Sequence, residues 1–312
     1  MLSIGLGCWG LGSESYGEVS EDSARDLIRC AVDQGIDFFD TAPLYGSGLS
    51  EIRLGKYLPR NREFRIATKV GIISDAEGVI EKHIHPDLIV KSVEESLRRL
   101  NRDNLFLLQI HSPEMHFENQ EILQKLMDLK SSGKVQKIGI SLKTPEMLPL
   151  QENLFQWDSF QYNCSILDQR VSAFKAILEL KASANALLIA RTPLNFGFLG
   201  AVPPQIESLS KHHHLSNWSS NQLQSWMMMR REVIDVLAPS QIDLLNAAIR
   251  FPLDSNLANL VIPGAINREQ LLQNLQAYSK PIPIEVASEL TNRIQQMKIE
   301  KSPYRIESSE SI

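Results

Sequence analysis

Four ionisable side chains fall at or just after the ends of successive predicted strands. Asp40 ends the second strand, Tyr45 follows it in a turn, Lys69 lies near the end of the third strand, and His111 ends the fourth. An ammonium beside a phenol stabilises the phenolate, so we expect Lys69 to lower the pKa of Tyr45 from its value of about 10 in water. Such a phenol can donate a proton to an oxygen on which negative charge develops.

The neighbouring groups fit the same chemistry. Asp40 can hold Lys69 charged and oriented, and His111 can hydrogen-bond a substrate oxygen. Protonation of an oxygen suits the reduction of a carbonyl compound, in which a hydride reaches the carbon. Because no amino-acid side chain supplies a hydride, the reaction requires a nicotinamide or flavin cofactor.

Alternating strands and helices must position these residues. Short runs of apolar residues recur about eight times between segments with helical spacing, and the runs are almost continuously apolar, as parallel strands covered on both faces should be. The predicted strands are Ser3 to Leu6, Phe38 to Thr41, Phe64 to Val70, Leu105 to His111, Val135 to Ser141, Ser159 to Tyr162, Ala186 to Arg191 and Leu257 to Ile262.

Helices are predicted between the strands from apolar periodicity and from residues typical of helix ends. Ser20 can cap the first helix, and Gly35 follows its last turn. The predicted helices are Glu21 to Gln34, Asp87 to Leu100, Glu118 to Lys130, Asp168 to Lys181, Gln241 to Phe251, Arg268 to Ala277 and Ile284 to Met297.

Eight β–α units without a break in composition predict a single (β/α)8 TIM barrel over residues 1 to 312, an α/β fold, rather than two domains. The C-terminal ends of the strands then share one rim, which brings the four ionisable residues together. Residues 194 to 225 are the least regular stretch, and they are a candidate loop over the cofactor or substrate. The polar tail at residues 301 to 312 is expected to be flexible.

Composition limits the partners. Lys and Arg number 32 and Asp and Glu number 37, giving a net charge of −5, which argues against nucleic acid as a partner. No window approaches the roughly 18 consecutive apolar residues of a membrane span. The three cysteines, Cys8, Cys30 and Cys164, form no CxxC motif. We expect a cytoplasmic protein with a small-molecule carbonyl or alcohol substrate; the sequence does not indicate its oligomeric state.

Gly5, Gly7 and Gly10 spell the G-x-G-x-x-G of a dinucleotide-binding turn, but their context argues against a Rossmann fold. Only four residues precede Gly5, and the next acid at a strand end, Asp40, lies 40 − 10 = 30 residues beyond the last glycine, where about 20 are expected. A glycine-rich strand exit at which the backbone approaches a ligand is the favoured interpretation.

Several short motifs, taken in order from Ile4 to Ala277, resemble the aldo/keto reductase family. They are Asp40-Thr41-Ala42, Tyr45-Gly46, Ser50-Glu51, Leu54-Gly55, Ala67-Thr68-Lys69, Gln109-Ile110-His111, Gly139-Ile140-Ser141 and Ile262-Pro263-Gly264-Ala265. The resemblance implies an NAD(P)H-dependent oxidoreductase that interconverts an aldehyde, ketone or sugar and the alcohol. Its catalytic tetrad falls on Asp40, Tyr45, Lys69 and His111, with Tyr45 as general acid and base.

The resemblance also implies a nicotinamide cofactor extended across the rim. Ser141 and Gln161 match residues that hold the carboxamide, which needs both a donor and an acceptor. The other implied positions are Gly7 and Trp9 at the first strand exit, Arg191, Thr192, Leu194 and Gly197 after the seventh strand, and Pro263, Gly264, Arg268, Gln270, Gln273 and Asn274 at the adenosine end.

Three positions depart from the family pattern. Leu142 stands where an asparagine is common, Arg191 where many members stack an aromatic ring on the nicotinamide, and Ile266 where a basic residue is frequent. Arg268 is the basic residue nearby, so NADP(H) is favoured and NAD(H) is the alternative. Leu142 and Arg191 also motivate a second function, that of a nucleotide-binding sensor or regulatory subunit with little turnover.

Other conspicuous side chains have simpler explanations. His212 to His214 favour a solvated loop over a metal site, and no metal is expected. Trp226 to Met229 are interpreted as core and Cys8 as a small buried filler, whereas Trp9 and Leu44 suit pocket lining and packing equally. A metal-dependent hydrolase is disfavoured because no set of histidines and carboxylates lies at the strand ends. The substrate class stays open among sugars, lactols, aromatic aldehydes and ketones.

Overall fold

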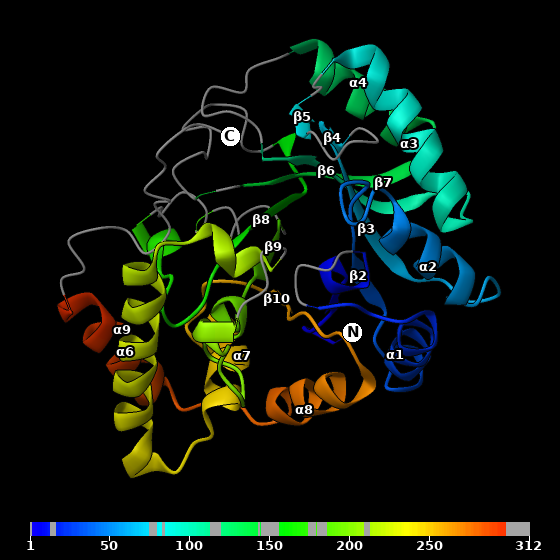
Figure 1. Ribbon diagram of the computed structural model, residues 1–312. Coiled ribbons are helices and arrows are strands. Elements are labelled where there is room, and N and C mark those ends of the chain that lie inside the picture. Colours follow the sequence, from blue (N-terminus) through cyan, green and yellow to red (C-terminus); the bar gives the residue numbers. More distant parts are fainter. Residues whose placement is uncertain are drawn as a thin grey trace.

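Eight parallel strands form the wall of a barrel in the computed structural model (Figure 1), which confirms the predicted (β/α)8 fold. The structure describes residues 2–12, 17–74, 80–82, 85–112, 120–142, 144, 156–173, 179, 186–208 and 213–297. In their order around the barrel the strands are β1 (Leu6–Gly7), β2 (Phe38–Asp40), β3 (Arg65–Val70), β6 (Leu105–His111), β7 (Val135–Ser141), β8 (Ser159–Asn163), β9 (Leu187–Arg191) and β10 (Leu260–Ile262).

Glycines allow the first strand to close the barrel against the last. The amide of Gly5 donates to the Val261 carbonyl at 2.9 Å, and that of Gly7 donates to the Pro263 carbonyl at 3.1 Å. A Cβ atom on Gly5 would lie 2.8 Å from the Phe38 side chain, and one on Gly7 would lie 3.0 Å from the carbonyl oxygen of Ile262. At these two glycines the backbone therefore approaches neighbouring strands closely, while the approach to a ligand stays a prediction.

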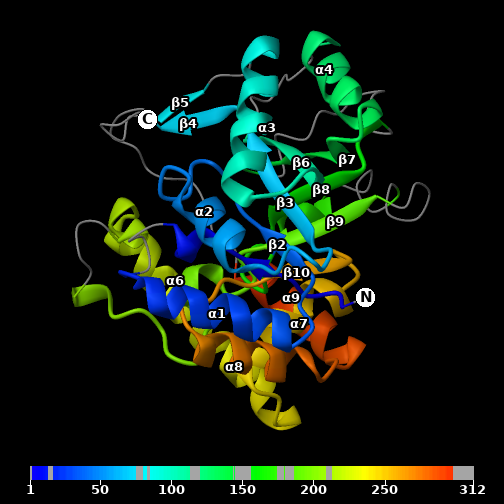
Figure 2. The same ribbon diagram turned by 90° about the vertical axis from the view of Figure 1, so that its right-hand side faces the viewer.

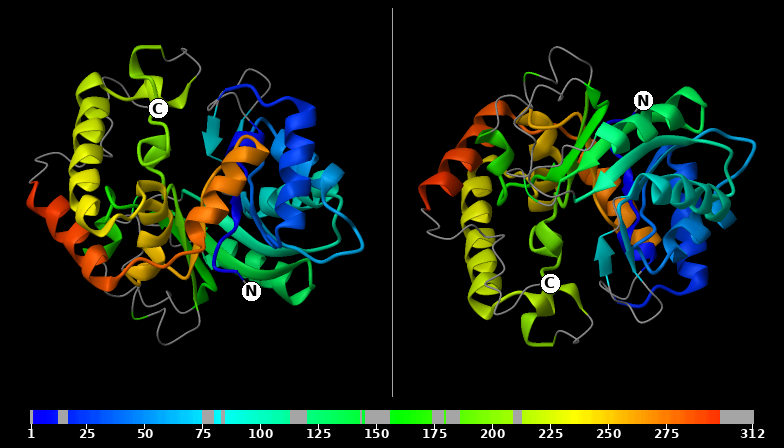
Figure 3. Two further views of the ribbon diagram at one scale, coloured as in Figure 1. Left: turned by 90° about the horizontal axis from the view of Figure 1, so that it is seen from below. Right: turned by 90° about the horizontal axis from the view of Figure 1, so that it is seen from above.

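Helices surround the barrel wall, with α1 beside α8 in Figure 2 and α6 beside α9 in Figure 3. Their bounds are α1 (Glu21–Asp33), α2 (Leu49–Tyr57), α3 (Pro86–Leu100), α4 (Gln120–Ser131), α6 (Ser220–Leu237), α7 (Leu244–Asp254), α8 (Arg268–Tyr278) and α9 (Ile284–Gln296). Six of the seven predicted helices match these within three residues at each end.

The remaining prediction, a helix over residues 168 to 181, lies partly outside the described residues, and residues 170–173 form a short 3-10 turn. Two helices were not predicted, α2 and α6, and neither was the hairpin of β4 (Ile72–Ser74) and β5 (Ile80–Lys82). The predicted flexible tail lies outside the described residues.

Inside the barrel, apolar side chains fill the part nearer the amino ends of the strands, and polar side chains lie at the carboxyl ends. The interior cluster consists of Phe38, Ala67, Leu107, Ile189, Leu260 and Ile262. A larger apolar cluster packs between the strands and the helices, and it includes Trp226 and Met229, as predicted for core residues. The core interpretation is wrong for Met228, which is 52% exposed because it faces outward from α6. In the part of the chain that the structure describes, no helix combines the length and apolar character needed to cross a membrane.

The candidate loop at 194 to 225 contains short helical turns among its described residues. They are η5 (Asn195–Gly197), η6 (Ile206–Ser208) and η7 (His214–Asn217), after which α6 begins at Ser220. The turn η5 contains strained backbone, because Asn195 and Phe196 both have positive φ. Strain of this kind persists only where surrounding contacts over-determine the conformation.

Candidate active site

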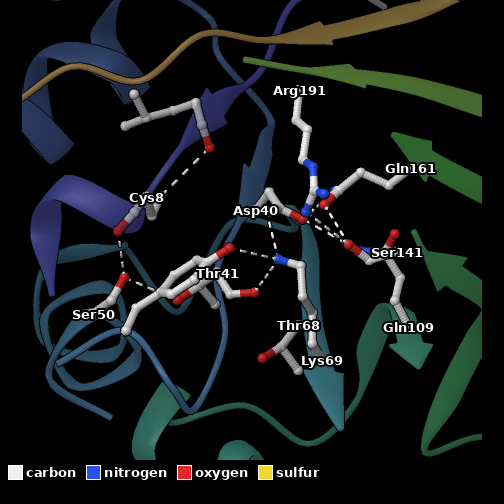
Figure 4. Close-up of polar contacts among 12 residues, drawn as sticks. Cys8, Asp40, Thr41, Ser50, Thr68, Lys69, Gln109, Ser141, Gln161 and Arg191 are labelled. Carbon is white, nitrogen blue, oxygen red and sulfur yellow. Dashed lines mark hydrogen bonds and ion pairs between the residues drawn. The ribbon is translucent and has the colours of Figure 1, made fainter. Parts of the chain in front are cut away.

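Lys69 is the centre of a buried polar cluster at the mouth of the barrel (Figure 4). Its Nζ donates to Oδ1 of Asp40 at 2.6 Å, to the carbonyl of Thr41 at 2.8 Å and to the phenol oxygen of Tyr45 at 3.2 Å. Asp40 ends β2, and the pairing of Asp40 with Ala67 places the next inward-facing residue of β3, Lys69, beside it. The structure thus brings together three of the four ionisable residues as predicted.

Burial changes the pKa values of this cluster. It raises the pKa of Tyr45 above its ordinary value, and the opposing effect of Lys69 does not overcome it. The expectation that Lys69 lowers the pKa of Tyr45 below its value in water is therefore wrong in net direction. Burial also opposes the charge on Lys69, but Asp40 and Tyr45 outweigh it and raise the pKa of the ammonium. Tyr45 is consequently a protonated donor at neutral pH, next to a fixed positive charge.

His111 completes the set from the end of β6. Its ring lies edge-on to that of Tyr45, with centroids 6.4 Å apart and an angle of 87° between the planes. Burial, together with the charges of Lys69 and Arg191, holds the pKa of His111 well below its ordinary value of 6.5. The imidazole is therefore neutral at physiological pH and has one N–H to donate.

Two amides bind the second oxygen of Asp40. Gln161 donates from Nε2 to Oδ2 at 2.7 Å, and Gln109 does so at 3.2 Å. The Oε1 atom of Gln161 in turn accepts a hydrogen bond from Ser141 Oγ at 3.0 Å. No role was predicted for Gln109 from the sequence. Its position two residues before His111 places both side chains on the same face of the strand, which could have indicated that Gln109 points towards the site.

Arg191 is anchored beside the predicted carboxamide position. Its guanidinium donates to Oδ1 of Asn163 at 2.8 Å, to the carbonyl of Leu142 at 2.5 Å and to Ser141 Oγ at 3.4 Å. The side chain of Leu142 is fully buried in the core. A cation at Arg191 therefore occupies the neighbourhood of Ser141, while Leu142 contributes only its backbone carbonyl there. Thr192, with its hydroxyl on the same Asn163 oxygen at 3.0 Å, extends this anchored group.

Aromatic rings cover one side of Tyr45. The indole of Trp9 stacks on the Tyr45 ring, with centroids 6.3 Å apart and planes 30° apart, and the His214 ring packs against Trp9 at 5.4 Å. The ring centroid of Phe196 lies 5.2 Å from that of His214. His214 is only 8% exposed, so the solvated-loop interpretation is wrong for this histidine, which packs as an aromatic side chain. Cys8, as predicted, is a fully buried filler.

The predicted adenosine-end residues gather where β10 leads into α8. Asn274 donates from Nδ2 to the carbonyl of Gly264 at 3.1 Å, and Oε1 of Gln270 accepts from the amide of Ile266 at 3.1 Å. Asn267 caps the helix, while Arg268 and Gln273 are exposed. The exposed guanidinium of Arg268 and the side-chain amides of Gln270 and Gln273, near the N-terminus of α8, suit a phosphate group.

The pairing of Gly7 with Gly264 places the first strand exit next to this segment, with Pro263 buried beside it. On the other side of the rim, Leu194 precedes the turn that ends at Gly197.

Comparison with known proteins gives a family match over most of the chain. The sequence model of the aldo/keto reductase family matches residues 3–294. Aldo-keto reductase YhdN of Bacillus subtilis is 36% identical over 141 residues, which span 44% of this chain and 42% of that protein. D-threo-aldose 1-dehydrogenase of a Pseudomonas species is 28% identical over 92% of each chain. Aldo-keto reductase yakc [NADP(+)] of Schizosaccharomyces pombe is 28% identical over 63% of this chain and 59% of its own.

Solved structures share the fold. Glycerol dehydrogenase AKR11B4 from Gluconobacter oxydans superposes with a TM-score of 0.80 at 24% identity, covering 99% of this chain and 95% of that one. At this identity the likeness establishes the barrel architecture alone.

Proposed function

The chain belongs to the aldo/keto reductase family and is an NAD(P)-dependent oxidoreductase, and on that premise we propose that Tyr45 is the general acid and base with which it interconverts a carbonyl compound and an alcohol. The observation that carries this proposal is the position of Lys69 Nζ, 2.6 Å from Asp40 and 3.2 Å from the Tyr45 oxygen. The His111 ring beside the same phenol supports it.

A bound nicotinamide supplies the hydride in reduction and accepts it in oxidation. In reduction, Tyr45 donates its proton to the carbonyl oxygen, and the resulting phenolate is stabilised by the ammonium of Lys69. Asp40 keeps that ammonium charged and aimed at the phenol. The neutral imidazole of His111 donates an N–H to the same substrate oxygen and so fixes its orientation. In oxidation the phenolate accepts the alcohol proton by the same path.

The residues at the rim fit a nicotinamide. Ser141 Oγ and Gln161 Oε1 form a donor and acceptor pair 3.0 Å apart. A carboxamide has both an acceptor and a donor. Its oxygen can accept from the Ser141 hydroxyl, and its NH2 group can donate to Gln161 Oε1. The capped start of α8 and the exposed Arg268 support NADP(H) over NAD(H), because they suit a 2′-phosphate. The name of the Schizosaccharomyces relative is consistent with this preference.

A sugar is the substrate class to test first. Trp9 is half-buried beside Tyr45, and its ring offers an apolar face on which the C–H face of a sugar can pack. The relative that aligns over 92% of both chains is named for an aldose. We therefore propose an aldose or a related small hydroxy-aldehyde.

The decisive assay follows NADPH absorbance with aldoses, glyceraldehyde and aromatic aldehydes. The unaltered enzyme should oxidise NADPH with at least one of them, and Tyr45→Phe should reduce kcat by about 10³-fold, within the range expected for loss of a general acid. Binding of NADPH, measured by fluorescence titration, should persist in this variant. Tyr57→Phe, which removes from the end of α2 a phenol hydroxyl whose hydrogen bond to Glu21 is exposed, is the matched control and should retain full activity.

Two results would contradict the proposal. The first is near-normal turnover by Tyr45→Phe. The second is tight binding of NADPH by the unaltered protein without turnover of any carbonyl compound, which is the outcome that the sensor alternative predicts.

A further inference from the structure

Gln109 is a buried glutamine whose amide contacts the catalytic cluster without reaching the reacting atoms. We infer that Gln109 is a positioning residue that fixes the orientation of Asp40 and thereby the place of Lys69 beside Tyr45. The inference rests on the proposed function of Tyr45, since it concerns the group that supports this phenol.

The geometry places Gln109 directly behind the ion pair. Its side chain is fully buried, and Nε2 donates to Asp40 Oδ2 at 3.2 Å. In the β3–β6 pairing Gln109 stands opposite Lys69, so both partners of Asp40 project from adjacent strands into the barrel. Lys69 binds Oδ1 and Gln109 binds Oδ2, which restrains the carboxyl group at both oxygens.

The other half of the Gln109 amide indicates that this contact is selected for something other than stability. Its Oε1 atom is buried and has no hydrogen-bond partner among the residues that the structure describes. A buried acceptor without a partner destabilises the fold, whereas leucine has a similar shape and carries no polar atoms. A glutamine at this position therefore destabilises the fold through its Oε1 atom, and what it provides that leucine does not is the N–H donated to Asp40.

Gln109 differs from Gln161, the second amide on Asp40 Oδ2. Gln161 also bonds Ser141, and under the proposed function it exchanges that partner for the carboxamide. When Gln161 Oε1 exchanges Ser141 for the carboxamide, Gln161 Nε2 can stay on Asp40, so both amides donate to Oδ2. The side chain of Gln109 has no hydrogen bond to Ser141 among the residues that the structure describes, and its one bond is the bond to Asp40. The terminal torsion of an aspartate is soft, so a second donor on Oδ2 helps to hold the carboxylate in one orientation.

The charges around the pair decide how a change at Gln109 is transmitted. The titratable and charged groups around the pair come from five strands or the segments that follow them. They are Cys8 after β1, Asp40 at the end of β2 and Tyr45 after it, Lys69 on β3, His111 at the end of β6 and Arg191 at the end of β9. A new negative charge at Gln109 would add to that of Asp40 and oppose formation of the Tyr45 phenolate.

Two substitutions separate positioning from folding. Gln109→Glu keeps the shape, and at low pH the introduced carboxyl group is protonated and can donate to Asp40. As the pH rises this proton is lost, and the second negative charge should raise the pKa at which Tyr45 ionises by about one unit. Gln109→Leu keeps the apolar shape without a donor. It should lower kcat about tenfold with little change in KM, the size expected for loss of one hydrogen bond to a charged group.

The measurements are the pH profile of alcohol oxidation and the titration of the Tyr45 ring carbon by NMR on protein labelled with ¹³C-tyrosine. Tyr45→Phe assigns the resonance, and Gln136→Glu, the same change at an exposed site on β7, is the matched control. The inference predicts the upward shift in Gln109→Glu by both measurements and the kcat loss in Gln109→Leu.

The inference is overturned if both Gln109 variants lose thermal stability alone, with kcat per folded molecule and the Tyr45 titration equal to those of Gln136→Glu. If the unaltered protein shows no turnover, the proposed function fails. The NMR titration, which needs no substrate, still decides whether Gln109 controls the ionisation of Tyr45.

Discussion

Replacement of Lys69 by methionine separates what the ammonium does for the fold from what it does for the reaction. The side chain is fully buried, and its Nζ lies between Asp40 and Tyr45. Methionine has a similar length and no charge. The variant therefore leaves Asp40 without its charged partner and leaves the Tyr45 phenolate without its stabilising cation.

The two effects have different magnitudes. Removal of one partner of a buried ion pair costs about 3–5 kcal/mol of folding free energy, because the other charge stays buried. A unit charge 3.2 Å from the phenol oxygen is worth about 5 kcal/mol at an effective dielectric constant of about 20. Asp40 offsets part of this attraction. If half of it survives, kcat falls by about 10²-fold, since each 1.36 kcal/mol is a factor of ten.

The assay compares Lys69→Met with Lys69→Met combined with Asp40→Asn. Urea unfolding should show a large loss of stability in the single variant and recovery of most of it in the double variant, because no buried charge is then left unpaired. NADPH-dependent reduction should stay at least about 10²-fold below that of the unaltered enzyme in both. Recovery of turnover together with stability in the double variant would refute the role of the ammonium in stabilising the phenolate.

Two further predictions follow from the pKa directions. His111 has a pKa well below 6.5, so the kcat/KM profile should show no ionisation near pH 6.5; a limb there that disappears in His111→Gln would contradict a neutral imidazole. Hydrogen bonds from Lys56 and Tyr57 lower the pKa of Glu21 to about 2. The stability that Glu21 contributes is therefore present above its ordinary pKa near 4.5 and is lost as the pH falls towards 2. Glu21→Gln should cost about 0.5–1 kcal/mol at pH 7, since the side chains of Lys56 and Glu21 are 57% and 45% exposed, and urea unfolding near pH 2 should show no difference from the parent.

The barrel could be predicted because strands buried on both faces leave continuous apolar runs, and the polar residues that end those runs must meet at one rim. Asp40 and Lys69 were found in this way. Helix α2 was not, for two reasons visible in the structure. It begins after the left-handed Gly48 without a side-chain cap, and it turns the charged side chains of Glu51 and Arg53 inward. Glu51 accepts hydrogen bonds from buried or partly buried groups on β3 and α3. Because α2 buries these charged residues, its sequence lacks the apolar stripe from which a helix is predicted.

The electrostatics of the site could be predicted only in part. The pairing of Lys69 with Tyr45 follows from strand order, but the extent of burial, which sets the net direction of the Tyr45 pKa, depends on the packing around the finished barrel. The burial of His214 likewise depends on packing that the sequence does not show. Three consecutive histidines look alike in the sequence, and only the fold decides that this one packs against Trp9 and Phe196.

A single turnover tests the central claim, that Tyr45 moves the proton, most directly. Enzyme mixed with NADPH is combined with an aldehyde substrate in a stopped-flow instrument, in H2O and in D2O, for the unaltered protein and for Tyr45→Phe. We predict that the unaltered enzyme oxidises its NADPH more slowly in D2O, and that Tyr45→Phe binds NADPH but oxidises it about 10³-fold more slowly. Oxidation by Tyr45→Phe at the rate of the unaltered enzyme, with the same dependence on D2O, would contradict the claim.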